Sequence, residues 1–480
     1  MAASVSGRLL VGARLRRLRD EHGLSQAALA RRIDKSTSYV NQLENDQRPI
    51  TVSVLLALTR EFDLSADYFA ADTDARLVAD LAEALATGPD GVGATRAQIT
   101  ELVSRMPDVG RTIAALHRRL VAAESELDTY RGQASNVGST TPMPFEEVRD
   151  FFYDRKNYID VLDRAAEAMF ERHSLRIGGL DLQLATLLSR EYGISVSIGH
   201  DNDPGEAARR PKRVYDADQR VVRLAGRLTS GQRAFQLATQ LALITQADVV
   251  DAVIAEATEL SEESRSVARI GLANYFAGAL VLPYERFRAA AEEARYDIEL
   301  LCVGFDVGFE TVCHRLSTLQ RPGHRGVPFI FVRTDRAGNI SKRQSATAFH
   351  FSRAGGSCPL WVVHDAFDSP GRIVTQVSQM PDGRSYFWLA RSTDEGLGYL
   401  TQHKSFAIGL GCDLGHADRL IYSTGVDLAD DRRIVPIGAG CKVCPRPACP
   451  QRAFPQVGSP IEVDVTVSDS IPYRAAPAPR

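Results

Sequence analysis

Two stretches near the start of the chain decide the fold of its first domain: Leu24-Ser25-Gln26-Ala27-Ala28-Leu29-Ala30 and Ser38-Tyr39-Val40-Asn41-Gln42-Leu43-Glu44. Apolar residues recur in both stretches at helical spacing, and Ser25 and Ser36 are placed to cap the two helices. The flanking sequence has the same periodicity, so the helices expected are residues 9–22, 26–33, 37–45 and 51–62. Because only a short turn joins the middle two helices, the sequence predicts an all-α helix-turn-helix domain over residues 8–70.

Side chains that point away from the expected core of this bundle are suited to DNA. The expected core is Leu18, Leu29, Ala30, Ile33, Val40, Leu43, Leu55 and Leu58. On the second helix of the motif this leaves Asn41 and Gln42 facing outward, and such amides pair bidentately with adenine edges. Between Arg8 and Arg48 we count nine Lys and Arg against five Asp and Glu, a local excess that favours phosphate contacts. The expected DNA contacts are Arg16, Gln26, Lys35, Thr37, Ser38, Asn41, Gln42 and Arg48.

The two opening stretches resemble the phage-repressor or Cro type of helix-turn-helix, over about 60 residues. The resemblance implies a homodimer that reads an imperfect palindrome of double-stranded DNA, with half-sites about one helical turn apart. The alternative is a helical module that binds a protein partner instead of DNA.

Composition limits the class of the whole chain. Its 480 residues suffice for roughly three domains, and 44% hydrophobic and 24% charged residues are ordinary for a globular protein. A net charge of −3 means that any DNA affinity must come from a local patch. We find no signal peptide and no run of about 18 apolar residues, so we expect no membrane contact. Seven cysteines, an odd number that all lie beyond residue 300, favour a reducing cytoplasm.

The rest of the chain is predicted to be helical first and rich in strands later, so we expect a multidomain protein. An all-α N-terminal domain is followed by a mostly helical middle domain and an α/β C-terminal domain. We expect a helical linker at residues 71–143, with heptad-like spacing in its last part, and one long amphipathic helix from Phe145 to His173. The C-terminal strands expected are residues 327–332, 372–377, 386–389 and 406–410. The domain boundaries are 144–322 for the middle domain, 323–455 for the C-terminal domain and 456–480 for a flexible tail.

The segment from Arg233 to Leu243 resembles a metallopeptidase helix that has lost its ligands. In the related peptidase-like domain, two His at positions i and i+4 hold zinc and a Glu between them is the base. Here Thr239, Gln240 and Leu243 stand at those positions, so we expect no catalytic residues and no enzyme activity. A retained cleft without metal is suited to a ligand, and its candidate walls are Phe235, Leu243, Tyr275 and Phe276. The alternative for these four residues is plain hydrophobic core.

Three cysteines within nine residues, Cys441, Cys444 and Cys449, indicate a metal centre, because convergent thiolates need a metal to neutralise them. The fourth ligand must come from elsewhere. Cys412 is our first choice, Cys358 the second and His416 the third. Four-thiolate sites suit both zinc and an iron–sulfur cluster, so both stay open, as do unliganded thiols. Cys302 and Cys313 lie in apolar helical sequence and are expected to be core thiols.

The order of these features resembles one family, the short-chain fatty-acyl transcriptional regulators of actinobacteria (the RamB and PrpR type), over roughly residues 9–455. The segments that carry the resemblance are Pro144–Phe151, Val312–Gln320, Gly355–Trp361, Cys412 and Cys441–Ala453. It implies control of acetate, propionate and glyoxylate-cycle or methylcitrate-cycle genes, an acyl-CoA effector and a [4Fe–4S] cluster in preference to zinc.

Basic clusters at Arg155-Lys156 and at Arg209-Arg210-Pro211-Lys212-Arg213 would suit the phosphates of CoA, or would simply be solvated. The rival hypotheses are a metal- or redox-sensing regulator with structural zinc and no acyl-CoA, a peptidase that cleaves a partner repressor, and a protein-binding module.

Overall fold

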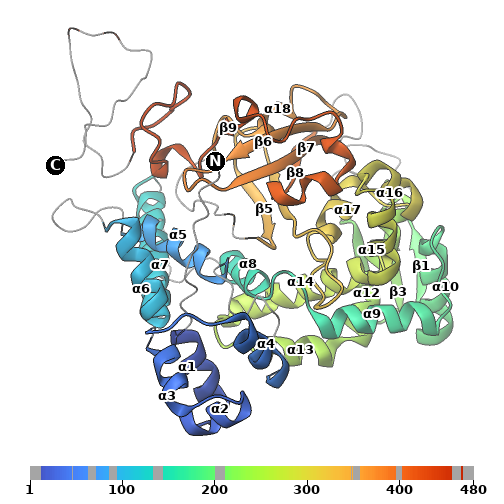
Figure 1. The fold of residues 1–480 in the computed structure, drawn as a ribbon. Helices are drawn as coiled ribbons and strands as arrows, with labels where there is room; N and C mark the ends of the chain where they lie inside the picture. Colours follow the sequence, from blue (N-terminus) through green and yellow to red (C-terminus); the bar gives the residue numbers. More distant parts are fainter. Residues whose placement is uncertain are drawn as a thin grey trace. The chain divides into compact units, whose positions relative to one another are not determined.

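The computed structural model divides the chain into two compact units, residues 1–140 and 141–480 (Figure 1). It describes residues 12–45, 47–62, 72–85, 94–132, 144–199, 211–347, 349, 357–395, 403–456, 466 and 468. The expected tail at 456–480 and the basic pair Arg209-Arg210 therefore lie almost wholly outside the described residues.

The first bundle has the predicted helix-turn-helix. Its helices are α1 (Gly12–Glu21), α2 (Gln26–Arg32), α3 (Thr37–Glu44) and α4 (Val52–Glu61). Both predicted caps are confirmed, because the Ser25 hydroxyl accepts from the Ala28 amide and the Ser36 hydroxyl from the Tyr39 amide, each at 3.1 Å. Seven of the eight predicted core residues are buried, and Leu55 packs against them at the margin.

The segment expected as a helical linker is helical and also has a core of its own. Helices α5 (Asp72–Ala84), α6 (Arg96–Arg105) and α7 (Pro107–Gly132) pack against one another. The buried residues of this small core are Val78, Leu81, Ile99, Val103 and Ala114. A Cβ at Gly110 would lie 3.2 Å from Leu81 Cδ1, so the glycine lets α7 approach α5 closely.

The second unit begins with a helical half around a small sheet. Its helices are α8 (Pro144–Asp154), α9 (Asp160–Arg172), α10 (Leu180–Tyr192), α12 (Ser230–Thr245), α13 (Ala247–Ala255), α14 (Glu262–Val281), α15 (Tyr284–Glu293), α16 (Ile298–Phe305) and α17 (Phe309–Leu316). The strands β1 (Ser195–Ile198), β2 (Arg213–Asp216) and β3 (Val221–Leu224) have the order β1-β3-β2, with β1 and β3 parallel. The single long helix predicted for residues 145–173 is wrong. Lys156 and Asn157 have φ of +51° and +57°, a left-handed conformation that ends α8 before α9 begins.

A six-stranded sheet forms the C-terminal half of this unit, in the order β5-β4-β8-β7-β6-β9. Its strands are β4 (Ile330–Thr334), β5 (Ile340–Ser345), β6 (Val374–Gln379), β7 (Ser385–Glu395), β8 (Lys404–Asp413) and β9 (Val435–Pro436). All neighbours are antiparallel except β6 and β9. The short helices are α18 (Val362–Asp365), η2 (Leu414–Arg419), η3 (Ile421–Ser423), η4 (Asp431–Arg433) and η5 (Cys441–Val443).

The helical half and the sheet share one hydrophobic core. Phe387, Leu389, Ile408 and Leu410 on one face of the sheet belong to the same buried cluster as the helices α9 to α17. The opposite face carries a second cluster around Trp388, which packs over Gly411, where a Cβ would lie 2.5 Å from the indole. The boundary predicted at residue 322 is therefore not a break in packing.

Candidate functional site

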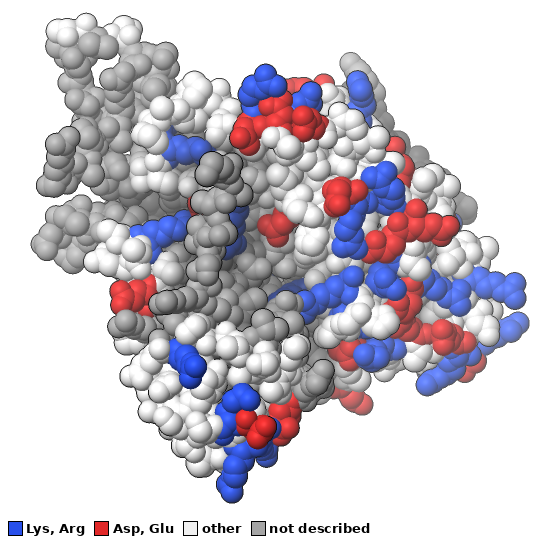
Figure 2. Space-filling view, viewed as in Figure 1, with Lys and Arg blue, Asp and Glu red and all other residues white. Residues whose placement is uncertain are grey.

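The residues predicted to contact DNA lie on the surface of the first bundle. Thr37, Ser38 and Asn41 on α3 are exposed, and Gln42 is half-buried. Lys35 and Arg48 are exposed at the two ends of α3, and the Arg48 guanidinium lies 4.9 Å from the centre of the Tyr39 ring. In the view of Figure 2, blue side chains with a few red ones among them lie at the lower end of this bundle. The surface is suited to an acidic duplex.

Gln26 and Arg16 also serve the fold, through a buried carboxylate that sequence reasoning missed. Glu44, in the last turn of α3, accepts hydrogen bonds from Arg19 Nε at 2.7 Å and from Gln26 Nε2 at 2.8 Å. Arg16 donates to the Glu44 carbonyl at 3.1 Å and to Asn45 Oδ1 at 3.0 Å. These contacts fix α3 against α1 and α2, and Gln26 and Arg16 remain predicted phosphate contacts.

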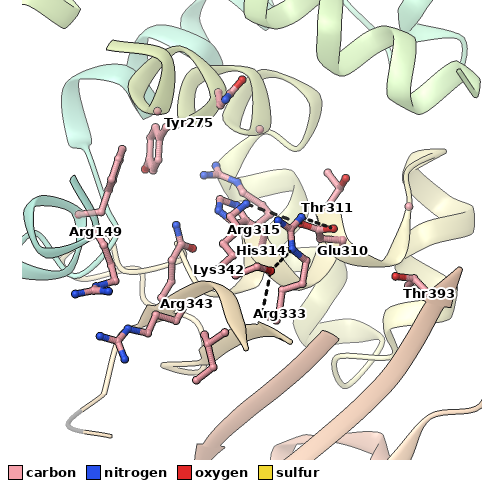
Figure 3. A pocket seen from close by; sticks show the side chains of 18 of the residues that line it. Arg149, Tyr275, Glu310, Thr311, His314, Arg315, Arg333, Lys342, Arg343 and Thr393 are labelled. Carbon is pink, nitrogen blue, oxygen red and sulfur yellow. Dashed lines mark hydrogen bonds and ion pairs between the residues drawn. The ribbon is translucent and has the colours of Figure 1, made fainter. Parts of the chain in front are cut away.

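A cavity of about 1040 Å³ opens between α8, α12, α14, α17 and β5 in the second unit (Figure 3). Two of the four predicted pocket residues, Phe235 and Tyr275, line it. The other two do not line it: Phe276 is fully buried in the core, and Leu243 packs against that core. Both lie on the same helices as the true lining residues, but they face inward.

The cavity is lined by more basic than acidic side chains. The basic ones are Arg149, Lys212, Arg315, Arg333, Lys342 and Arg343, and the acidic ones are Glu146 and Glu310. Lys212 comes from one of the predicted basic clusters. The other cluster does not reach the cavity, because Arg155 stacks 4.0 Å from the centre of the Phe151 ring. Sequence reasoning missed Lys342 and Arg343 because it did not predict strand β5, and it missed Arg333 because the strand expected at residues 327–332 ends one residue before it.

One wall of the cavity is held by a buried ionic network. Arg315 on α17 donates to both oxygens of Asp163 on α9, each at 2.9 Å. The Tyr275 hydroxyl donates to Asp163 Oδ2 at 2.6 Å and accepts from the Ile159 amide at 3.1 Å. Burial, together with the charge of Asp163, raises the pKa of Tyr275 well above its usual value. The network joins three helices at the wall and keeps Tyr275 a neutral hydrogen-bond donor.

His314 stands among the cations of the opposite side. Burial and the neighbouring charges of Lys342, Arg315 and Arg333 hold the pKa of His314 well below its usual value. Its ring meets Phe331 edge-on, with centroids 5.5 Å apart. The imidazole is therefore neutral at physiological pH and offers a hydrogen bond without adding charge.

The first of the former peptidase positions, Thr239, makes hydrogen bonds inside the protein. Thr239 Oγ1 donates to the Phe235 carbonyl at 2.8 Å and to Asn274 Oδ1 at 3.3 Å. Thr239 and Gln240 are buried, and Leu243 carries no ligand atom. The helix pair α12 and α14 thus keeps the scaffold and lacks the residues that would bind zinc.

Four cysteines line one small pocket at the end of the sheet: Cys358, Cys441, Cys444 and Cys449. Our first choice for the fourth ligand, Cys412 on β8, is buried in the shared core and does not line this pocket. The third choice, His416 in η2, does not line it either. Cys358, the second choice, lines this pocket together with the three clustered cysteines.

A buried arginine shapes the cysteine loop. Arg452 donates to the carbonyls of Cys441 at 3.1 Å, Cys444 at 3.0 Å and Phe454 at 3.3 Å, and also to that of Arg446. Gly438 is required there, since a Cβ would lie 2.7 Å from Cys444 Sγ. Among the described residues, no three side chains of His, Cys, Asp or Glu are arranged so that they could hold a metal ion. The donor set of four thiols around one pocket fits zinc or a cluster.

Comparison with known proteins agrees with this architecture. A helix-turn-helix profile matches residues 15–69 and an IrrE N-terminal-like domain profile matches residues 199–317. The profile for the C-terminal part of the short-chain fatty acyl coenzyme A regulators matches residues 318–473. The chain is 62% identical to the HTH-type transcriptional regulator PrpR of Mycobacterium tuberculosis strain H37Rv, over 98% of this chain and 97% of that protein. The chain belongs to the short-chain fatty acyl coenzyme A regulator family.

Further relatives support the same assignment. The HTH-type transcriptional regulator RamB of M. tuberculosis is 46% identical over 96% of this chain and 98% of its own length. The propionyl-CoA carboxylase regulator of Cereibacter sphaeroides is 40% identical over 97% of this chain and 98% of its own length. A solved M. tuberculosis transcriptional regulator, 64% identical, covers 70% of this chain and 100% of its own, with a TM-score of 0.66. This acyl coenzyme A regulator is therefore a DNA-binding transcription regulator and not an enzyme, as predicted.

In this regulator the cavity and the cysteine pocket share a wall. Ser357 and Ala439 line the cavity, whereas the adjoining Cys358 and Gly438 line the cysteine pocket. The Ser357 hydroxyl lies 3.0 Å from His364 Nε2 and donates to the Gly338 carbonyl at 3.2 Å.

No single helix among the described residues is long and apolar enough to span a membrane, although two bent helix pairs have the length and composition to do so together.

Proposed function

We propose that this regulator binds an acyl-CoA in the cavity and, as a cytoplasmic homodimer on a palindromic operator, controls genes of short-chain acyl metabolism. The observation that carries the ligand proposal is the charge of the cavity lining: apart from Arg315, which Asp163 neutralises, it has five cations against two carboxylates, beside apolar walls. CoA is a polyanion that carries an acyl group, so its phosphates suit the cations and its acyl chain suits rings such as Phe235 and Tyr275.

The relatives point to the same chemistry. One relative is named a propionyl-CoA carboxylase regulator, and the matching C-terminal profile is named for short-chain fatty acyl coenzyme A. A ligand changes DNA affinity only through its different affinity for two arrangements of the protein. An acyl-CoA held between α8, α14 and β5 would favour the arrangement in which these elements close on it.

Calorimetric titration of the full-length protein, prepared without oxygen, tests the ligand proposal. Propionyl-CoA, acetyl-CoA and free CoA are compared at one pH and salt concentration. We expect saturable binding of all three, with one acyl form preferred because the apolar wall contributes only when an acyl chain is present. Absence of saturable binding by a protein with its metal centre intact would rule the cavity out as a CoA site.

We further propose a [4Fe–4S] cluster held by Cys358, Cys441, Cys444 and Cys449, with zinc at the same four thiols as the second candidate. When bound, the cluster supplies a redox-active group, and these residues hold it beside the shared wall. Cys358→Ala is expected to lose bound iron and visible absorbance, as is Cys444→Ala. Cys412→Ala is the matched control and should keep both, because that thiol is buried in the core.

Metal analysis separates the outcomes. Stoichiometric zinc without iron in protein prepared anaerobically would favour the structural zinc site. Iron lost from Cys412→Ala but retained by Cys358→Ala would overturn the ligand set.

A further inference from the structure

Helix α7 carries an exposed apolar stripe. Val109, Leu116 and Leu120 are 46%, 57% and 56% exposed, and Ile113 between them is half-buried. The packed face of α7 is a different one, where Ala114 is 3% exposed inside the small core with α5 and α6. The helix therefore has a second apolar face that its own bundle does not cover.

The spacing of this stripe is a heptad repeat. Counting Ile113 and Leu120 as position a puts Val109 and Leu116 at position d. The same register continues along α7 to its end at Gly132 and places Ala123, Leu127 and Tyr130 at d, a and d. Apolar residues thus occupy seven successive a and d positions over 22 residues of one helix. A seam of this kind is specific to pairing with another helix.

The charges beside the seam identify the other helix. Positions g and e are Arg119 and Glu124 in one pair of heptads and Glu126 and Arg131 in the next. In a parallel, in-register coiled coil, position g of one chain meets position e of the following heptad in its partner. Two copies of this helix would therefore bring Arg119 to Glu124 and Glu126 to Arg131. All four charged g and e residues meet an opposite charge.

We propose that α7 is the dimerisation helix of this regulator and pairs in parallel with α7 of a second copy. The proposal deepens the homodimer in the proposed function, by naming its surface and its orientation. A parallel pair places the N-terminal ends of both α7 helices together, so both helix-turn-helix domains precede the same end of the coil. This arrangement suits a two-fold operator, whose half-sites lie about one helical turn apart.

Sedimentation of the full-length protein over a range of concentrations tests the surface. Leu116→Glu with Leu120→Glu removes four leucines from each dimer, and we expect the dimer dissociation constant to rise at least about a hundred-fold. Arg111→Glu is the control, because position 111 is exposed, lies on α7 and falls at the outward position f. That variant should dimerise as the wild type does.

Charge exchange tests the orientation and does not depend on disturbing the apolar seam. Arg119→Glu alone sets like charges opposite each other twice per dimer and should weaken dimerisation about ten-fold. Adding Glu124→Arg should restore it, because residues 119 and 124 are not neighbours within one helix. Rescue by Glu126→Arg instead would mean an antiparallel pair and would overturn the parallel register.

The outcomes also separate this proposal from the function that it rests on. A wild-type dimer that persists in the double leucine variant would overturn the α7 interface and leave dimeric operator binding intact. A wild-type protein that stays monomeric and protects a single half-site would overturn both.

Discussion

The two sides of the cavity hold their cations in different ways. On the α9–α14–α17 side, the Arg315 side chain is 3% exposed and that of Asp163 is 0% exposed, and the pair is bidentate. The other side is formed by β4 and β5, and we call it the β5 side. There Arg333 and Lys342 lie 3.1 Å and 4.0 Å from Glu310 Oε1, and all three side chains are 28% to 38% exposed. One side is a closed ion pair inside the protein, and the other is a loose cluster open to water.

The difference separates charges that serve the fold from charges that are available to a ligand. A buried cation cannot lose its carboxylate without a large cost, because nothing else compensates its charge. A partly exposed cation keeps much of its hydration, so exchanging Glu310 for a ligand phosphate costs little. We therefore expect substitutions on the first side to change stability, and those on the second to change affinity.

The largest expected effect is the loss of the buried carboxylate. Asp163→Asn leaves Arg315 buried without its counter-charge and should lower the free energy of unfolding by about 3–5 kcal/mol. Asp160→Asn is the matched control on the same helix, since Asp160 pairs with Arg164 and their side chains are 52% and 62% exposed. The Asp160→Asn variant should lose less than about 1 kcal/mol of the free energy of unfolding. Urea unfolding of the full-length variants measures both, and equal shifts would remove the distinction between the two sides.

Acid should weaken the fold through His314, which lies where the two sides meet. Its pKa is lowered in the folded state by burial and by the adjacent cations. Its contribution to stability is therefore complete above the unfolded pKa of about 6.5 and is lost as pH falls toward the folded pKa. The loss is at most about 1.4 kcal/mol per pH unit.

Unfolding measured from pH 7 to pH 5 checks this dependence. His314→Gln should flatten the pH dependence, whereas His324→Gln, at a position 58% exposed, should leave it in place. An unchanged slope in the His314 variant would show that the imidazole is not held neutral by this cluster.

The parts of the molecule governed by local sequence could be predicted. Ser25 and Ser36 cap their helices as expected, since a cap depends on residues three positions apart. The single helix over residues 145–173 could not be corrected from periodicity, because the apolar spacing continues through Lys156 and Asn157 while their backbone turns left-handed. No glycine or proline marks that break.

The candidate sites depend on contacts between residues distant in sequence, so only some of their residues could be predicted. The three clustered thiols were evident from spacing, but the choice between Cys358 and Cys412 depends on which distant segment lies beside the loop. Strand β5 was missed because Ser341-Lys342-Arg343-Gln344 is polar on both faces, as an edge strand can be. The open side of the cavity was missed with it.

The smallest expected effect, and the one that tests the open side, concerns ligand affinity. Lys342→Gln removes one partly exposed cation and should weaken CoA binding about ten-fold, since a charge-assisted hydrogen bond contributes about 1.5 kcal/mol or more. Glu310→Gln should act in the opposite direction, because it removes the carboxylate that competes with a phosphate for Arg333 and Lys342. Neither variant should change the free energy of unfolding by more than about 1 kcal/mol. Calorimetry under the conditions used for the wild type measures both affinities. If the two variants shift affinity in the same direction, or unfold as readily as Asp163→Asn, the β5 side is part of the scaffold and the phosphates bind elsewhere.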